Sequence, residues 1–464
     1  MRKPALSILA ALLAVLLGAP LLSVQAAVPA SEADHLGKDL TAVGAERAAN
    51  KEGTIPTFEG IDKPPAGWEW GKPRHLFSRL KDEKPEFVID ASNVDKYADK
   101  LSPTQIYALK NIKGYTMPVY KTHRNCGMPP LIEERSKINA LEAKLAPNGY
   151  GLLHAKTAGV PFPIPKNGAE VMWNYKLRVA GVGMFYQKGG SVISPRPGTN
   201  EFVNYDWQLY NYFPGGTRQN KNVEDFGTEF YQYYAYSAPP ALAGQALLGI
   251  NYLNKEPEAY YYFPGQRRVR RMPTYQNDTP LIGFENQYTT DQEMFVWSDL
   301  SRFDYKLVGR REMYIPYNTF RMFDFTAKRS DIWLKDFANP DFRRYELHRV
   351  WVVEATVKSG MRHIFPKRMF YADEDSWLIT LGDEFDANLK PWKLREAMEA
   401  PIWELDGVCS VSGFVQYDMQ GGRYLADYFS ITQGVDERWY WESNAPQFKP
   451  DFYTPETLRS IMER

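Results

Sequence analysis

The feature that most constrains the fold of this chain is a succession of short aromatic and β-branched stretches that starts near residue 170 and runs almost to the C-terminus. Glycine, proline and Asn-Asp turn signals separate these stretches. Strands spaced in this way, with few helical patterns between them, predict a large antiparallel sheet or part-barrel. The predicted strands are residues 171–182, 202–213, 229–237, 246–253, 259–263, 295–297, 303–315, 347–357, 363–371, 377–381, 408–419 and 424–431.

The composition agrees with a protein that is mainly β with some α. Of its 464 residues, 30 are Tyr, 25 are Phe and 12 are Trp. Tyr and Trp combine a large apolar area with a polar tip, which suits broad sheets, wet cavities and interfaces. The 56 basic and 56 acidic residues give a formal net charge of zero, which argues against a nucleic-acid partner held by bulk charge.

Two hairpins are predicted in the C-terminal half. Residues 349–357 and 361–371 flank Gly360, which supplies the positive φ that a short hairpin loop needs. A second hairpin should turn at residues 373–375 before the strand that follows. The sequence Asp-Glu-Asp at this turn could hold a calcium ion or a catalytic acid, but its acids do not alternate as in a calcium loop, so we expect a solvated turn.

Helices are predicted over residues 103–112, which Ser102 can cap, over residues 131–145, which share an apolar face, and over residues 391–400. Gly and Pro are frequent in residues 27–66, which predicts an extended strap. We therefore divide the chain into a signal peptide (1–26), the strap (27–66) and a single β-rich domain (67–464) with helical insertions at about 102–146 and 391–400.

The N-terminus has the three parts of a secretory signal peptide. Arg2 and Lys3 precede an apolar run, and a small-x-small site ends at Ala26, after which we predict cleavage. A retained membrane anchor is the alternative, but Gly18 and Pro20 interrupt the run before it reaches spanning length. The first cysteine is Cys126, so the mature chain should carry no lipid anchor.

Motifs of the common catalytic classes are absent from the sequence, including HExxH, GxxxxGK, GxSxG and GxGxxG. His348 and His363 should not converge on a metal and are interpreted as polar sheet residues. Cys126 follows His123, which raises a nucleophile hypothesis, whereas in an oxidising compartment Cys126 could instead pair with Cys409. We assign no catalytic residue, metal ligand or cofactor.

The densest basic cluster follows an aromatic strand that ends in Pro264-Gly265. On a strand, one face of this cluster could contact an anionic headgroup or an acidic partner, or the charges could protect an edge strand. Both interpretations stay open. The candidate headgroup or partner contacts are Arg267, Arg268, Arg270 and Arg271, and the candidate ligand contacts are Tyr260, Tyr262, Trp351 and Val353.

Several ordered motifs resemble a proteobacterial family known as outer membrane lipoprotein-sorting proteins, or domain of unknown function 1329. They occur at residues 37–41, 44–47, 53–56, 159–165, 264–271, 350–356 and 367–377. The family is similar to the periplasmic carriers LolA and LolB. The resemblance therefore implies a curved antiparallel half-barrel wrapped over helices, with a cavity for acyl chains on its concave face.

The resemblance also implies a function. We expect a periplasmic carrier of a lipid or other hydrophobic molecule, working with an RND-type exporter or an outer-membrane protein. Two alternatives stay open: a periplasmic hydrolase or lyase whose site is invisible in sequence, and a structural partner of an exporter that carries nothing. A compact cluster of perturbed carboxylates in the concavity would favour the hydrolase.

Overall fold

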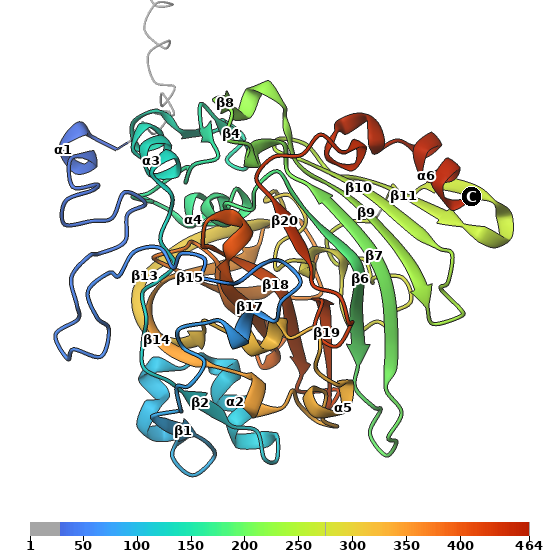
Figure 1. Ribbon diagram of the computed structural model, residues 1–464, viewed down its shortest axis with the longest axis horizontal. Helices are drawn as coiled ribbons and strands as arrows, with labels where there is room; N and C mark the ends of the chain where they lie inside the picture. Colours follow the sequence, from blue (N-terminus) through green and yellow to red (C-terminus); the bar gives the residue numbers. More distant parts are fainter. Residues whose placement is uncertain (1–27, 274, 464) are drawn as a thin grey trace, which may run out of the picture.

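The computed structural model describes residues 28–273 and 275–463, so the signal peptide and its cleavage site lie outside the described residues. A sixteen-stranded sheet dominates these residues (Figure 1). In sheet order its strands are β1 (Phe87–Ile89), β2 (Met117–Val119), β14 (Tyr345–Val357), β15 (Lys367–Asp373), β16 (Ile379–Phe385), β17 (Pro391–Ile402), β18 (Val408–Asp418), β19 (Arg423–Phe429), β6 (Gly183–Ile193), β7 (Val203–Tyr212), β9 (Thr228–Ala238), β10 (Ala246–Tyr252), β11 (Glu258–Phe263) and β12 (Arg268–Arg271).

Two more strands pair beside this path: β13 (Phe303–Pro316) with β14, and β20 (Arg438–Tyr440) with β6. The pairs are antiparallel, apart from one parallel contact between β2 and β14. Among the described residues, the edge strand β12 pairs only with β11, so the sheet does not close into a barrel. Two small sheets pair β3 (Lys144–Leu145) with β4 (Leu152–Leu153) and β5 (Lys156–Thr157) with β8 (Lys221–Asn222).

The helices are short and few, which confirms a mainly β protein with some α. They are α1 (Ala30–Ala33), α2 (Pro103–Asn111), α3 (Pro130–Glu142), α4 (Gly168–Lys176), α5 (Arg329–Ile332) and α6 (Pro455–Met462). The helices predicted at 103–112 and 131–145 correspond to α2 and α3. Ser102 caps α2 as expected, in a capping box with Gln105.

Two element predictions are wrong. The helix predicted at 391–400 is strand β17, which pairs on both sides with β16 and β18. Pairing on both sides outweighs the local helix propensity of its residues. Conversely, the strand predicted at 171–182 begins inside α4, whose N-cap Asn167 accepts a hydrogen bond from the Glu170 backbone N–H. Residues 295–297 form no strand either.

Both predicted hairpins are present, as β14–β15 and β15–β16. The turn at 373–375, however, is buried and not solvated. Arg124 holds both Asp375 oxygens, at 2.7 and 2.9 Å, and Arg349 contacts Glu374 at 3.1 Å. The prediction failed because the partners of this turn lie far away in sequence.

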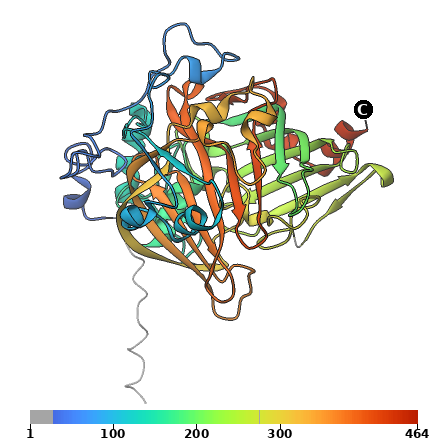
Figure 2. The ribbon, with the colours of Figure 1, turned by 90° about the horizontal axis from the view of Figure 1, so that it is seen from below.

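Residues 275–302 occupy the concave face of the sheet. The ring of Phe284 stacks on that of Tyr205 in β7, with 4.5 Å between the ring centres. The backbone carbonyl of Trp297 accepts a hydrogen bond from the Asn251 side chain in β10. The Gln292 side chain donates a hydrogen bond to Glu384 in β16. Strands β10 and β16 are seven steps apart in the strand order, or roughly 34 Å in a flat sheet. A single segment can reach both only because the sheet wraps around it (Figures 1 and 2).

The opposite face of the sheet carries a second layer. Helix α2 packs on β17, and the Ser102 hydroxyl donates to Asp383 of β16 at 2.7 Å. At the other end of the sheet, α6 lies beside β10 and β11 (Figure 1), where Leu458 packs with Tyr233 and Tyr262. Tyr261, the neighbour of Tyr262, belongs to the concave-face core instead. Successive side chains of a strand point to opposite faces of the sheet, so Tyr261 and Tyr262 belong to two separate apolar clusters.

The N-terminal strap is fixed to the body by the same arginines that hold the buried turn. Arg124 donates to the Glu46 carbonyl at 2.7 Å, and Arg349 donates to the Ala48 carbonyl at 3.0 Å. Nearby, Cys126 and Cys409 form a disulfide, with 5.2 Å between their Cα atoms. This bond joins β18 to the segment after β2, and it leaves Cys126 without the free thiol that a nucleophile requires.

Candidate functional site

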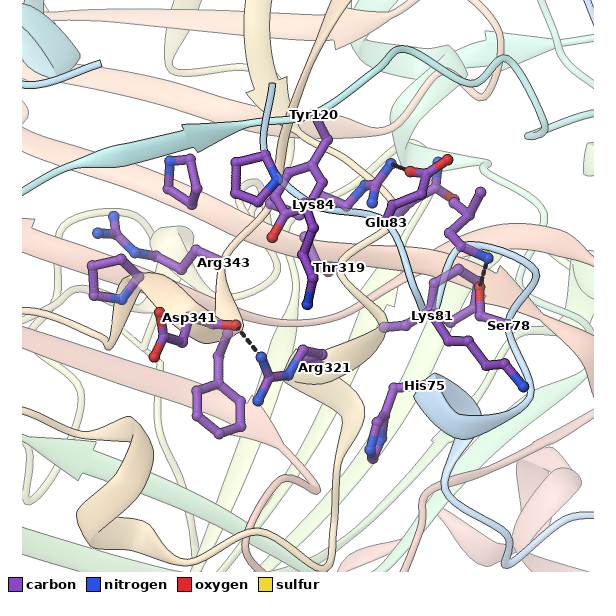
Figure 3. Close-up of a pocket in the computed structure, with 18 of the residues that line it drawn as sticks. His75, Ser78, Lys81, Glu83, Lys84, Tyr120, Thr319, Arg321, Asp341 and Arg343 are labelled. Carbon is purple, nitrogen blue, oxygen red and sulfur yellow. Dashed lines mark hydrogen bonds and ion pairs between the residues drawn. The ribbon is translucent and has the colours of Figure 1, made fainter. Parts of the chain in front are cut away.

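A half-open pocket of about 900 Å³ lies beside β1 and β2, at one end of the sheet (Figure 3). Its walls come from separate parts of the chain: η1 (Arg74–Leu76) and the loop after it, β1, β2, η7 (Phe320–Phe323) and η8 (Pro340–Phe342). The apolar lining consists of Leu76, Leu80, Pro85, Val88, Pro118, Tyr120, Phe320, Pro340 and Phe342. The charged lining consists of His75, Lys81, Asp82, Glu83, Lys84, Arg321, Asp341, Arg343 and Arg344.

Two of the lining arginines have carboxylate partners within 4 Å. Arg344 contacts Glu83 at 2.7 Å and Glu346 at 2.6 Å. Arg343 donates to the Thr116 carbonyl at 2.7 Å and lies 3.9 Å from Glu396. Both side chains therefore build the pocket wall.

Arg321 has a different environment. Its Nη1 donates to the Asp341 carbonyl at 2.7 Å, and its guanidinium lies 4.5 Å from the centre of the Phe342 ring. The 3-10 helix that supplies both partners is capped by the Asn339 side chain, which accepts from the Asp341 N–H. These contacts fix the guanidinium in place without any carboxylate beside it among the described residues.

His75 lies at the edge of the pocket. Burial lowers its pKa from the usual value, which outweighs the opposite effect of Asp324 at 3.7 Å. The ring is therefore neutral at pH 7, and its buried Nδ1 has no partner among the described residues. A neutral imidazole with a free nitrogen can hydrogen-bond a ligand as donor or acceptor.

A buried polar network lies behind the pocket wall. The Asn318 amide donates to Glu346 at 3.1 Å, and His348 lies 3.3 Å from Glu346 and 3.7 Å from Asp373. Burial raises the pKa of Glu346, but Arg344 and His348 outweigh it and lower the pKa to about 2. Burial and the neighbouring Asp375 raise the pKa of Asp373 to about 6.

This network contains a constellation with metal-ligand chemistry. Ligand atoms of His348, Asp373 and Asp375 lie within 4.8 Å of one another. Both oxygens of Asp375 are engaged by Arg124, however, and a guanidinium at that position would repel a cation. We interpret the constellation as an ion-pair network. His363, by contrast, lies 3.0 Å from Asp291, so the two late histidines do not converge.

The concave face holds two carboxylates with perturbed pKa values. Burial raises the pKa of Glu293 to about 8 and that of Asp427 to about 6. Tyr428 donates to Glu293 at 2.8 Å, and Tyr288 donates to Asp427. This is the cluster expected of a hydrolase, but Glu293 and Tyr288 themselves belong to the segment that fills the concavity. The carboxylates are 3 % and 0 % exposed, so we assign no reaction to them.

The ligand contacts predicted from sequence are dispersed. Tyr260 and Tyr262 lie on the face of β11 covered by α6, whereas Trp351 and Val353 lie on β14, at the other end of the sheet. Val353 is buried in the main core, and Trp351 stacks on Trp377 at 6.1 Å. The structure does not bring the two pairs together.

The predicted basic cluster is an exposed edge strand. Arg268, Arg270 and Arg271 stand on β12, and Arg267 precedes it with a positive φ of 52°. Two of them form long, exposed ion pairs at 3.9 Å, Arg267 with Glu463 and Arg271 with Glu258. None of the four lines the pocket. The sequence did not predict the pocket cations Lys81, Lys84 and Arg321. The two lysines are far from Arg321 in the chain, and none of the three belongs to a known motif.

Comparison with known proteins places the chain in a family. Residues 88–459 match the model of the family described as protein of unknown function DUF1329. The chain is also 39% identical over 446 residues to the uncharacterized protein PA3922 of Pseudomonas aeruginosa, with 94% of both chains covered. The chain belongs to the DUF1329 family. The resemblance inferred from the sequence motifs is confirmed.

Three solved structures are similar to this DUF1329 chain. A domain from Vibrio parahaemolyticus, described as an outer membrane lipoprotein-sorting protein, is 13% identical with a TM-score of 0.43, covering 63% of this chain and 98% of its own. A DUF1329 family protein from Desulfovibrio piger is 15% identical, with a TM-score of 0.38 and coverages of 59% and 92%. The LolA superfamily protein NE2245 from Nitrosomonas europaea is 10% identical, with a TM-score of 0.35 and coverages of 62% and 100%.

Proposed function

We propose that this DUF1329 protein is a periplasmic carrier that binds a lipid or another hydrophobic molecule in the half-open pocket. The observation that carries the proposal is the size and lining of that pocket, about 900 Å³ with nine apolar or aromatic residues beside nine charged or titratable ones. The volume lies within the range of about 300–1,000 Å³ of small-molecule sites, and the apolar half of the lining offers a surface for a hydrophobic chain. Each methylene removed from water there contributes about 0.8 kcal/mol.

The pocket replaces the concave face as the place for the cargo. The resemblance to LolA and LolB implied a cargo on the concave side, but residues 275–302 occupy that face and make it part of the core. A cargo there would have to displace Phe284, Phe295 and Trp297, which are at most 1 % exposed. The pocket needs no such displacement.

The cellular setting belongs to the same proposal. The secretory signal supports export to the periplasm with cleavage after Ala26. In the part of the chain that the structure covers, every helix is too short or too polar to span a bilayer. An RND-type exporter or an outer-membrane protein would then load or unload the carrier.

The test is saturable binding of a fluorescent fatty-acid probe to the purified mature protein, together with mass spectrometry of co-extracted lipid. Val88, which lines the pocket and is 41% exposed, is changed to Trp to fill it. The matched control is Val308→Trp on β13, where Val308 is 52% exposed and does not line the pocket.

We expect probe binding in the wild type and in Val308→Trp, and at least a tenfold weaker binding in Val88→Trp. Absence of both lipid and probe binding would contradict the carrier function. Equal binding by the two variants would place the cargo elsewhere on the molecule.

A further inference from the structure

Three cations border the pocket without a carboxylate partner among the described residues. Lys81 and Lys84 stand on the exposed loop that follows η1, and Arg321 stands on η7. The ion pairs of the pocket belong to other side chains. In Figure 3 the ends of Lys84 and Arg321 lie on facing sides of the open space. A half-enclosed pocket that gathers positive charge attracts anions from solution.

The acids of the lining do not neutralise these cations. Glu83 is engaged by Arg344 and by His123, each at 2.7 Å. Asp341 accepts from Arg321 only through its backbone carbonyl, and Figure 3 shows its carboxylate turned away from the open space. Asp82 is exposed and forms no ion pair with a described residue. The pocket therefore has donors for an anion that none of the described lining carboxylates engages within ion-pair distance.

Arg321 is prepared for such a ligand. One of its nitrogens is held by the Asp341 carbonyl, and Phe342 supports the plane of the guanidinium. Its remaining N–H groups have no partner among the described residues. A fixed guanidinium binds carboxylate and phosphate with two parallel hydrogen bonds, and a lysine adds a mobile point charge.

We propose that the cargo is an anionic amphiphile, whose phosphate or carboxylate group binds between Arg321 and Lys84, with Lys81 at the rim and the apolar chain against Leu76, Val88 and Phe320. The inference rests on the proposed carrier function and names its ligand class. It also selects this pocket over the β12 arginines as the headgroup site.

The experiment compares three probes by isothermal titration calorimetry, each amphiphile below its critical micelle concentration. Dodecyl phosphate carries both the chain and the anion, dodecyl maltoside carries the chain alone, and inorganic phosphate carries the anion alone. The variants are Lys84→Gln and Arg321→Gln. Arg268→Gln on β12 is the matched control, because Arg268 is exposed and also lacks a carboxylate within ion-pair distance in the part of the chain that the structure describes. Circular dichroism and the urea midpoint check that every variant is folded.

We expect dodecyl phosphate to bind at least tenfold more tightly than dodecyl maltoside, and more tightly still at low salt. Lys84→Gln and Arg321→Gln should each weaken dodecyl phosphate about tenfold and leave dodecyl maltoside unchanged, because each removes a charged hydrogen bond. Arg268→Gln should change neither.

The other outcomes separate the two proposals. Equal binding of dodecyl phosphate and dodecyl maltoside, with no effect of the variants, overturns the anionic ligand and leaves the carrier standing. If Arg268→Gln alone weakens the binding of dodecyl phosphate, the headgroup site is on β12, and this result also overturns the inference. Inorganic phosphate binding as tightly as dodecyl phosphate supports the anion site but contradicts the carrier function, and binding of none of the probes contradicts both.

Discussion

The concave face of the sheet and the pocket beside η7 differ in how far their polar groups are satisfied. On the concave face, Arg368 contacts Asp291 and Glu384 at 2.7 Å each, and all three are about 2 % exposed. Around the pocket, Lys84 and Arg321 have no such partners among the described residues. The curvature of a sheet therefore does not by itself create a binding cavity. The open space lies instead beside the short strands β1 and β2 at one end of the sheet, where loops and 3-10 helices complete the wall.

The largest effect should come from breaking the concave-face network. Arg368→Met removes the 2.7 Å ion-pair partner that Asp291 and Glu384 share, and both carboxylates stay buried. His363 beside Asp291 and Gln292 beside Glu384 replace that charge only in part, so we expect the free energy of unfolding to fall by about 3–5 kcal/mol. Urea denaturation followed by tryptophan fluorescence measures this. A loss below about 1 kcal/mol would mean that residues 275–302 are not part of the cooperative core.

A second effect should come from the disulfide that joins β18 to the segment leading out of β2. The bond closes a loop with a sequence separation of 283, so the double variant Cys126→Ala/Cys409→Ala should lose about 2–5 kcal/mol of stability. Its urea midpoint should not respond to reductant, whereas that of the wild type should fall to the same value. A wild-type protein insensitive to reductant would contradict this expectation.

A third effect should appear in the pH dependence of stability. The pKa of Glu293 is raised to about 8 by burial, above its unfolded value of about 4.3. Between these two values the folded state binds a proton that the unfolded state has lost, so stability decreases as pH rises through this window. Glu293→Gln mimics the protonated form and should flatten the decline between pH 5 and 8. Urea midpoints across that range measure it, and parallel curves for the two proteins would be inconsistent with the assignment.

The smallest effect should come from the pocket. Lys84→Met removes a charge that has no partner among the described residues, so the free energy of unfolding should change by less than about 0.5 kcal/mol. The same urea titration used for Arg368→Met provides the direct comparison. A loss of several kcal/mol would show that the pocket cations are structural, and the contrast between the two regions would disappear.

Sequence patterns predicted the sheet and both hairpins because aromatic and β-branched stretches and the turn residues between them are local signals. They failed at β17, where Arg395, Glu396 and Glu399 are buried and both neighbouring strands pair with it. A sequence of good helix formers gives no sign of such pairing. The burial of the turn at 373–375 could not be predicted from local sequence either, because its partner Arg124 lies 251 positions before Asp375.

For the candidate site, the sequence predicted the class of function but not the residues that form the pocket. The family motifs indicated a carrier, but the pocket is assembled from four separate segments of the chain, and no spacing relates Lys84 to Arg321. The predicted ligand contacts, such as Tyr260 and Trp351, belong to aromatic strands, which suit an apolar cavity. In the structure they lie at opposite ends of the sheet.

The hydrogen bonds between Arg349 and the N-terminal strap have a consequence for the order in which the chain can fold. These bonds, to the carbonyls of Glu46 and Ala48, span 303 and 301 positions. A chain that emerges N-terminus first, from a ribosome or through a membrane, therefore exposes the strap long before Arg349 arrives. Arg124 emerges much earlier and can contact the strap first. The strap can thus complete its contacts only when the last third of the chain is in place.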